Sequence, residues 1–352
     1  MTPFKDLSPT VTTLYAQLLQ LVQADEASRS IADLKGTFVC KKIKQKNYWY
    51  LQHRFSGKQT QTYLGPESLE LLNLIHNHQI GKTLKLSDQE NRKRLCSMLI
   101  QGGVMIPDSL SSRVIMLLAE SGVFKMGSVL VGTHAFQAYS QLLGVVWLQQ
   151  NRTQDIDIAQ ERHISVALAM ENASSDLPKV LDHARLGFVP VPPLNLKHPS
   201  TTFKILGREL HLDLLTPLVG KPTAKPIELP SLKVAAQPLR FLDYLISDPI
   251  ECVIPYDDGI LVYVPNPAYF VFHKLLVSTK REIAVVAKAK KDLSQALSLL
   301  EVLARDRKGD LSRAWEELKS RGKNWYQPVL KVLATVKGEN AIVQEILKEI
   351  VQ

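Results

Sequence analysis

Residues 127–160, GSVLVGTHAFQAYSQLLGVVWLQQNRTQDIDIAQ, contain the pattern that decides the fold. The β-branched segment 123–132 predicts a strand, and residues 133–144 predict a helix that ends at a glycine. A second strand is predicted at residues 153–160. This order of strand, helix and strand is typical of an α/β domain.

Two aspartates interrupt the second of these strands. Because side chains alternate along a strand, Asp155 and Asp157 point to one face while Ile156 and Ile158 point to the other. A third acid, Asp213, lies in the apolar segment ELHLDLLTP, the second arm of a hairpin predicted over residues 201–220. Partly buried carboxylates repel each other, and a cation is the natural way to neutralise them.

The acids favour a divalent metal site. Mg²⁺ prefers oxygen ligands and usually takes one or two carboxylates together with the phosphates of a substrate. Three acids on adjacent strands can hold two metal ions roughly 4 Å apart, the spacing used in phosphoryl transfer. We therefore predict Mg²⁺, or Mn²⁺, bound by Asp155, Asp157 and Asp213, with a nucleoside triphosphate (NTP) as substrate.

A glycine stands where the first strand turns into the helix. Gly132 lets the backbone approach phosphate oxygens, and Thr133 opens a helix whose first N–H groups attract anions. Both residues are candidates for phosphate binding. Gly127 and Ser128 are an alternative pair, but they lie at the start of the strand rather than at its end.

These motifs resemble the nucleotidyltransferase fold shared by polymerase β, the minimal nucleotidyltransferases and the abortive-infection type nucleotidyltransferase toxins. The family pattern is an apolar strand, Gly-Ser or Gly-Thr, a helix, Asp-x-Asp and a third Asp. Gly132 and Thr133 match its first part, and the three aspartates match the rest. The spacing between the glycine and the acid pair is longer than in the minimal enzymes. The similarity covers roughly residues 124–303 and looks closest to uncharacterised stand-alone bacterial nucleotidyltransferases.

The resemblance implies a reaction. It implies a domain built on a mixed α/β sheet. This domain would catalyse the metal-dependent transfer of a nucleotidyl group from an NTP to an acceptor hydroxyl, with release of pyrophosphate. Asp155 and Asp157 would hold both metal ions, and Asp213 would complete the second site and help to deprotonate the hydroxyl. Two other functions stay open: a non-catalytic nucleotide-sensing module or toxin–antitoxin partner, and a transferase that modifies a protein or a small molecule.

The C-terminal region is predicted to be helical from residue 267 onward. If one helix runs without a break, Lys274, Arg281, Lys288 and Asp292 share a stripe, at intervals of seven, seven and four residues. The related toxins carry a similar Lys, Arg and Lys-Asp after their catalytic domain. The resemblance thus implies that Lys274 and Arg281 bind the triphosphate. The two lysines directly before Asp292 fit an ordinary basic helix face.

Residues 37–64 alternate and contain turn signals, which predicts a three-stranded meander. Aromatic residues beside cations suit single-stranded nucleic acid or RNA. Alternation puts Tyr48 and Tyr50 opposite Trp49, so at least one set is expected in a core. The candidate nucleic-acid contacts are Lys41, Lys42, Lys44, Lys46, Trp49 and Arg54. Nucleic-acid binding and a structural role both remain open for this meander.

Composition limits the setting. The 352 residues include 43 Lys and Arg against 34 Asp and Glu, a net charge of +9 that favours a polyanionic partner, RNA first. The three cysteines are far apart and suggest neither a disulfide framework nor a zinc site, which fits a reducing cytoplasm. No apolar run approaches the ~18 residues that a membrane span needs.

Four regions are expected along the chain. They are an N-terminal helix and β-meander (1–66), a helical connector (67–123), the catalytic domain (124–266) and a C-terminal helical domain (267–352).

Overall fold

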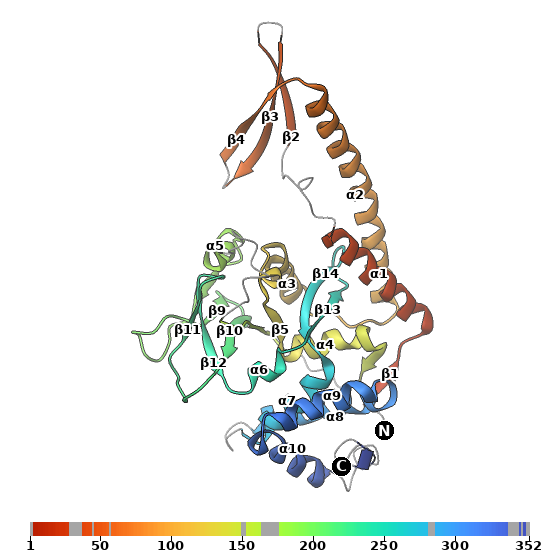
Figure 1. Cartoon of the computed structure of the whole chain (residues 1–352), viewed down its shortest axis with the longest axis vertical. Helices are drawn as coiled ribbons and strands as arrows, with labels where there is room; N and C mark the ends of the chain where they lie inside the picture. The colour runs from red at the N-terminus through yellow and green to blue at the C-terminus, as the bar shows by residue number, and fades with distance from the viewer. Residues whose placement is uncertain are drawn as a thin grey trace.

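The computed structural model of the chain describes most of its length and confirms the predicted mixed α/β class. The described residues are 3–27, 37–43, 46–55, 58–148, 153–162, 176–280 and 286–336, with 345, 348 and 349. Figure 1 shows a body of mixed sheets and helices, with a small sheet standing apart from it at the far end of one long helix.

A mixed sheet forms the centre of the body. Within the described residues, seven strands join it, in the order β11-β12-β10-β7-β5, with β9 beside β10 and β8 beside β9. Their bounds are β5 Val129–Val131, β7 Asp155–Ala159, β8 Phe188–Pro190, β9 Thr202–Ile205, β10 His211–Pro217, β11 Ile227–Leu229 and β12 Val234–Leu239. β7 is parallel to β10 and antiparallel to β5. The predicted hairpin is present as β9 and β10, which pair antiparallel.

The strand predicted over residues 123–132 is shorter than expected. Phe124–Met126 forms a 3-10 turn, and Gly127 follows it with a φ of 76°, so only Val129–Val131 is extended. Gly127 adopts this left-handed backbone conformation and ends the turn, so the strand begins later than predicted. The predicted helix is α4, Gly132–Leu143, and it ends at Gly144 with a φ of 67°.

Two short strands outside the central sheet were not predicted. β1 (Phe4–Asp6) pairs antiparallel with β6 (Val145–Trp147), so the start of the chain lies against the segment that follows α4. Each strand has three residues, too few for the alternation that reveals a strand in a sequence. The ring of Trp147 stacks on Phe136, with centroids 4.6 Å apart, and anchors this pair to α4.

Helices and a hairpin cover the other parts of the body. The N-terminal helices are α1 (Pro9–Ala27), α2 (Leu69–Gln101) and α3 (Ser109–Glu120), and the hairpin is β13 (Pro249–Ile254) with β14 (Ile260–Pro265). Arg92 on α2 is buried and donates to the backbone oxygen and to the carboxylate of Asp258, at 3.2 and 2.9 Å. This contact ties α2 to the loop of the hairpin.

The predicted meander is confirmed as a separate antiparallel sheet. Its strands are β2 (Thr37–Ile43), β3 (Lys46–Phe55) and β4 (Lys58–Pro66), in that order. Figure 1 shows it at the end of α2 that lies farthest from the body. Aromatic pairs contribute to the packing of this small sheet. The ring centroids of Tyr50 and Tyr63, for example, lie 5.4 Å apart.

The C-terminal region is helical, as predicted, but the unbroken helix on which the predicted stripe from Lys274 to Asp292 depended does not form. The chain forms α7 (Pro267–Ser278), α8 (Val286–Asp306), α9 (Lys308–Ser320) and α10 (Lys323–Val336). Because α7 ends at Ser278, Lys274 and Asp292 lie on two helices that pack together rather than on one stripe. Two short helices complete the described fold, α5 (Leu177–His183) and α6 (Leu242–Leu245). No helix in these described segments is long and apolar enough to cross a membrane.

Candidate active site

The acids meet at the centre of the sheet. β7 and β10 run parallel in a register that puts Asp157 opposite Asp213 and Asp155 opposite His211. The residues between them, Ile156 and Leu212, are fully buried and hold the strands against the core. The alternation predicted from the sequence therefore places one set of side chains in the core and the acids on the other face.

Gly132 lies directly against one of these acids. Its φ is 69°, and a Cβ at this position would lie 2.1 Å from the Asp157 carboxylate oxygen Oδ2. β5 delivers it there, because Val131 is the register partner of Asp157 across the antiparallel pair. No residue with a side chain fits between α4 and Asp157 without moving one of them.

The environment of Asp157 disfavours its charge. Burial raises the pKa of this carboxyl to about 7, and the neighbouring Asp213 and Asp155 contribute to the rise, while Lys274 and Lys288 oppose it. The acid is thus held in a place where it is costly to ionise. A positive ion beside it would reverse that balance.

The other two acids have their own partners. Thr202 on β9 donates its hydroxyl to Asp213, with Oγ1 2.5 Å from Oδ1. His211 Nδ1 lies 3.5 Å from Asp155 Oδ1, and both side chains are exposed, at 39% and 52%. Asp213 is therefore fixed from the neighbouring strand, and Asp155 faces solvent. Neither Thr202 nor His211 was predicted; contacts across strands are not visible in a sequence.

The donor chemistry suits a hard divalent cation. Three carboxylates on two neighbouring strands supply oxygen ligands. Burial first, and then repulsion from Asp213 and Asp155, raises the pKa of Asp157, and a bound cation would counter both effects. Among the described residues, no group of three or more His, Cys, Asp or Glu side chains is arranged so that it could already hold a metal ion. The residues fit Mg²⁺ or Mn²⁺ by charge and by ligand type.

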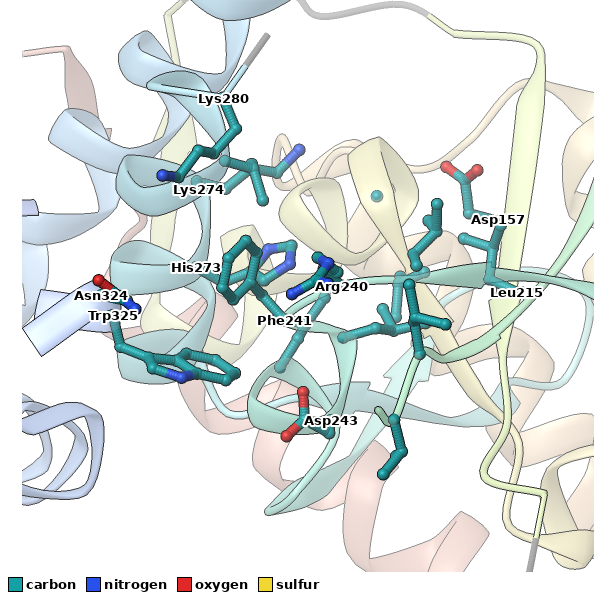
Figure 2. Close-up of a pocket in the computed structure, with 18 of the residues that line it drawn as sticks. Asp157, Leu215, Arg240, Phe241, Asp243, His273, Lys274, Lys280, Asn324 and Trp325 are labelled. Carbon is teal, nitrogen blue, oxygen red and sulfur yellow. The ribbon is translucent and has the colours of Figure 1, made fainter. Parts of the chain in front are cut away.

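A cavity of about 950 Å³ opens beside Asp157. Figure 2 shows Asp157 on one side of it and Trp325 with Asn324 on the other. Its wall includes Val131, Gly132, Asp157, Leu215, Leu218, Val219, Gly220, Leu239, Arg240, Phe241, Leu242, Asp243, Leu245, His273, Lys274, Val277, Lys280, Asn324 and Trp325. The volume falls in the range of small-molecule sites in proteins.

Comparison with known proteins decides the family. A family model described as a nucleotidyltransferase matches residues 109–320, more than half of the chain. The chain belongs to this nucleotidyltransferase family. A domain of unknown function (DUF6788) matches residues 13–73, which include most of α1 and the three-stranded sheet. No curated protein and no solved structure matches the chain. Nucleotidyltransferase domains generally use an NTP and a divalent metal ion.

Of the two cations predicted to bind phosphate in this nucleotidyltransferase, one can be located. Lys274 lines the cavity, and its Nζ lies 2.6 Å from Asp292 Oδ1, with the side chains only 12% and 5% exposed. It also lies over the ring of Phe270, 5.2 Å from the centroid. Arg281 lies outside the described residues.

Lys291, which the sequence pattern assigned to an ordinary basic face, is half-buried near the acids. Burial and the charge of Lys274 lower its pKa, whereas Asp155 and Asp157 act in the opposite direction. Sequence reasoning missed it because the break between α7 and α8 sets which face of α8 meets the site.

The two glycine turns differ in their surroundings. Gly132 lines the cavity at the start of α4, whereas Thr133, the next residue, is buried. Ser128, part of the alternative pair, directly precedes β5 and is fully buried. The cavity is therefore reached by the backbone at Gly132, at the positive end of the α4 dipole.

The predicted nucleic-acid contacts that the structure describes lie on the separate three-stranded sheet. Lys41, Lys42 and Lys46 are exposed. Trp49 is half-buried and donates its indole N–H to Glu67 Oε2 at 3.1 Å. Lys44 lies outside the described residues, and so does the side chain of Arg54, whose backbone belongs to β3.

The opposite face of this sheet gathers its tyrosines. Tyr48, Tyr50 and Tyr63 pack together, and Lys41 Nζ lies 4.7 Å from the centre of the Tyr50 ring. Tyr63 is 54% exposed. A cation beside aromatic rings thus occurs on the tyrosine face, opposite Trp49, as the alternation predicted.

Gly132→Ala tests the contact with Asp157. We expect a loss of more than ~2 kcal/mol in the free energy of unfolding, because the methyl group adds a clash to the ~1 kcal/mol of left-handed strain. Gly207→Ala is the matched control, since Gly207 has a φ of 71° and nothing within 4 Å of its added Cβ. Urea unfolding of both variants gives the comparison. Equal losses in the two variants would contradict the close contact.

Asp157→Asn tests the electrostatics of the acids. The raised pKa means that the folded protein binds a proton between about pH 4 and 7 that the unfolded chain releases, so metal-free stability falls as pH rises through this window. The variant should lose most of this slope and be at least as stable as wild type at pH 8. Glu228→Gln, an exposed acid on β11, is the control of equal charge change and should keep the slope. Melting temperatures from pH 4 to 8 measure it.

Proposed function

We propose that the protein transfers a nucleotidyl group from an NTP to a hydroxyl of an RNA acceptor. The acceptor oxygen attacks the α-phosphorus, a new P–O bond forms, and the bond from the α-phosphorus to the bridging oxygen of the β-phosphate breaks. Pyrophosphate leaves with the electron pair of that bond, and the proton of the hydroxyl passes to a carboxylate.

The arrangement of Asp157, Gly132 and Lys274 around one cavity carries the proposal. A carboxylate, a helix N-terminus without a side chain in the way and a buried ammonium group line the same space. Each favours a polyanion with a metal ion bound to it: the helix end and Lys274 attract phosphate, and Asp157 attracts the cation. Membership of the nucleotidyltransferase family supports the same reading.

Roles follow for the individual residues. Asp155, Asp157 and Asp213 would hold Mg²⁺ or Mn²⁺, which on binding would neutralise phosphate charge and polarise the α-phosphoryl group. Asp213, oriented by the Thr202 hydroxyl, would accept the proton of the attacking hydroxyl. Lys274 and the backbone at Gly132 and Thr133 would hold the triphosphate, with Arg281 as the second predicted cation.

The RNA acceptor is inferred from charge and from the separate sheet. The net charge of +9 favours a polyanion. Lys41, Lys42 and Lys46 are exposed on this sheet, and the tyrosine face beside Lys41 offers rings on which unpaired bases stack. A tRNA-like RNA is the first expectation, and the cytoplasm is the expected place of action.

Transfer of label identifies the reaction. The protein is incubated with Mg²⁺, total RNA and each NTP labelled on the α-phosphate or on the γ-phosphate. We expect α-label in an RNA band and γ-label in pyrophosphate. Asp157→Asn and Asp213→Asn should lower transfer on the order of 10²-fold or more, while Asp182→Asn, an exposed acid on α5, should not.

Other outcomes of this assay separate the alternatives. Label on a protein or on a small molecule would replace the RNA acceptor, and nucleotide binding without any transfer would favour a sensing module. Growth arrest on expression, lost in Asp157→Asn, would favour the predicted relationship to abortive-infection toxins. Full activity in Asp157→Asn would overturn the assigned site.

Charge removal on the sheet tests the RNA surface. The triple change of Lys41, Lys42 and Lys46 to Gln should weaken RNA binding for all sequences and lower the salt slope of log K by up to about 3. Tyr63→Ala should instead cost ~1–3 kcal/mol in RNA affinity and leave the slope unchanged. The control changes the exposed Lys197, Lys225 and Lys331 to Gln, an equal charge change. Filter binding at several salt concentrations measures both the RNA affinity and its salt slope. An unchanged slope in the triple-lysine variant would mean that this sheet has a structural role and does not bind RNA.

A further inference from the structure

The cavity beside Asp157 has two chemically different ends. Asp157 and Gly132 form one end, and Phe241, Trp325 and Asn324 form the other, which we call the aromatic end. Figure 2 shows Asp157 on one side of the cavity and Trp325 with Asn324 on the other, with His273, Phe241 and Arg240 between them. The proposed function uses the acid end and leaves the aromatic end without a role.

Contacts behind the aromatic end hold its rings in place. Trp325 meets Phe241 edge to face, with centroids 4.7 Å apart and planes at 83°. The Arg321 guanidinium lies 5.1 Å from the centre of the Trp325 ring. Arg321 is in turn fixed by Asp243 and by Glu317 Oε1, the latter at 2.9 Å. The indole is therefore preorganised, which reduces the entropy lost when a flat ligand binds against it.

Phe241 reaches the cavity from a strained backbone. Its φ is 68°, a left-handed value that costs a residue with a side chain roughly 1 kcal/mol or more. It directly precedes α6, and its ring is half-buried at the cavity wall. The fold retains an aromatic side chain at a position where glycine would be less strained.

Cations occupy the wall between the two ends. Lys274, Lys280 and Arg240 all line the cavity, and Lys280 and Arg240 are exposed. A ligand with a flat ring at one end and several negative charges toward the other matches this order of groups. An NTP has that order, because its phosphates follow its base and sugar.

The acids divide the two substrates between two sides. Asp157 lines the cavity, whereas Asp155 and Asp213 are not part of its wall as the described residues define it. Asp155 is 52% exposed and lies beside the exposed His211. Under the proposed function, this open side would admit the acceptor hydroxyl, and the cavity would be left to the nucleotide.

We propose that the aromatic end of the cavity binds the base of the NTP against Trp325 and Phe241, while the triphosphate lies toward Lys274 and Gly132. This inference rests on the proposed function, since it assigns a further part of the same nucleotide. The base contributes affinity beyond that of the triphosphate, and changes at Trp325 remove this extra affinity alone.

Tripolyphosphate separates the two contributions. Calorimetry in Mg²⁺ compares tripolyphosphate with each of the four NTPs on wild type and on Trp325→Leu. At least one NTP should bind wild type more tightly than tripolyphosphate does, and Trp325→Leu should weaken that NTP by about 5- to 150-fold, the range for one stacked base. Tripolyphosphate affinity should stay within about twofold. Phe241→Leu is the second variant and should act in the same direction.

Tyr326→Leu is the matched control. Tyr326 is the next residue on α10, is also half-buried, and packs edge-on against Trp315 away from the cavity wall. It should lose comparable stability without changing the preference for NTP over tripolyphosphate. The inference is overturned if label transfer and triphosphate binding are intact but all NTPs bind like tripolyphosphate, or if both cavity variants keep the preference. If no nucleotide is bound or transferred at all, the proposed function fails first.

Discussion

Repulsion between carboxylates on adjacent parallel strands is the constraint on which the candidate site depends. Asp157 and Asp213 are register partners, and burial together with this neighbour raises the pKa of Asp157 to about 7. A fold keeps such a pair only where the surroundings compensate. Lys274 and Lys288 act against the rise, and the Thr202 hydroxyl donates to Asp213.

The elements around the acids are arranged to tolerate this cost. Ile156 and Leu212 bury the opposite faces of β7 and β10, so hydrophobic packing holds the strands in a register that electrostatics opposes. The buried ion pair with Asp292 likewise holds the Lys274 side chain in place, because it fixes an ammonium group that would otherwise be mobile in solvent. Stability invested in packing thus keeps a charged site preorganised for a polyanion.

Sequence patterns predicted the parts of the fold that depend on local periodicity. The central strand with its acid pair, α4, the β9-β10 hairpin and the three-stranded sheet follow from alternation, helical spacing and turn residues. The break between α7 and α8 was not predicted, because apolar spacing continues across it. The cavity rings of Phe241, directly before α6, and of Trp325 on α10 were missed for a related reason: the two residues are far apart in sequence and meet only through tertiary packing. Residues that belong to a chemical motif, such as the acid pair, can be found in one sequence. The wall of a cavity cannot, because several elements far apart in sequence form it together.

The shape of the molecule bears on the size of the acceptor. α2 has 33 residues, which corresponds to a length on the order of 50 Å, and the three-stranded sheet lies at the end of it farthest from the body. Arg92 ties the other part of this helix to the β13-β14 hairpin, so the sheet is carried on a braced arm. A small acceptor would contact only the acids and would not reach the three-stranded sheet. An acceptor that engages both the exposed lysines of the sheet and the open side of the acids must be extended and polyanionic, and a structured RNA meets both requirements.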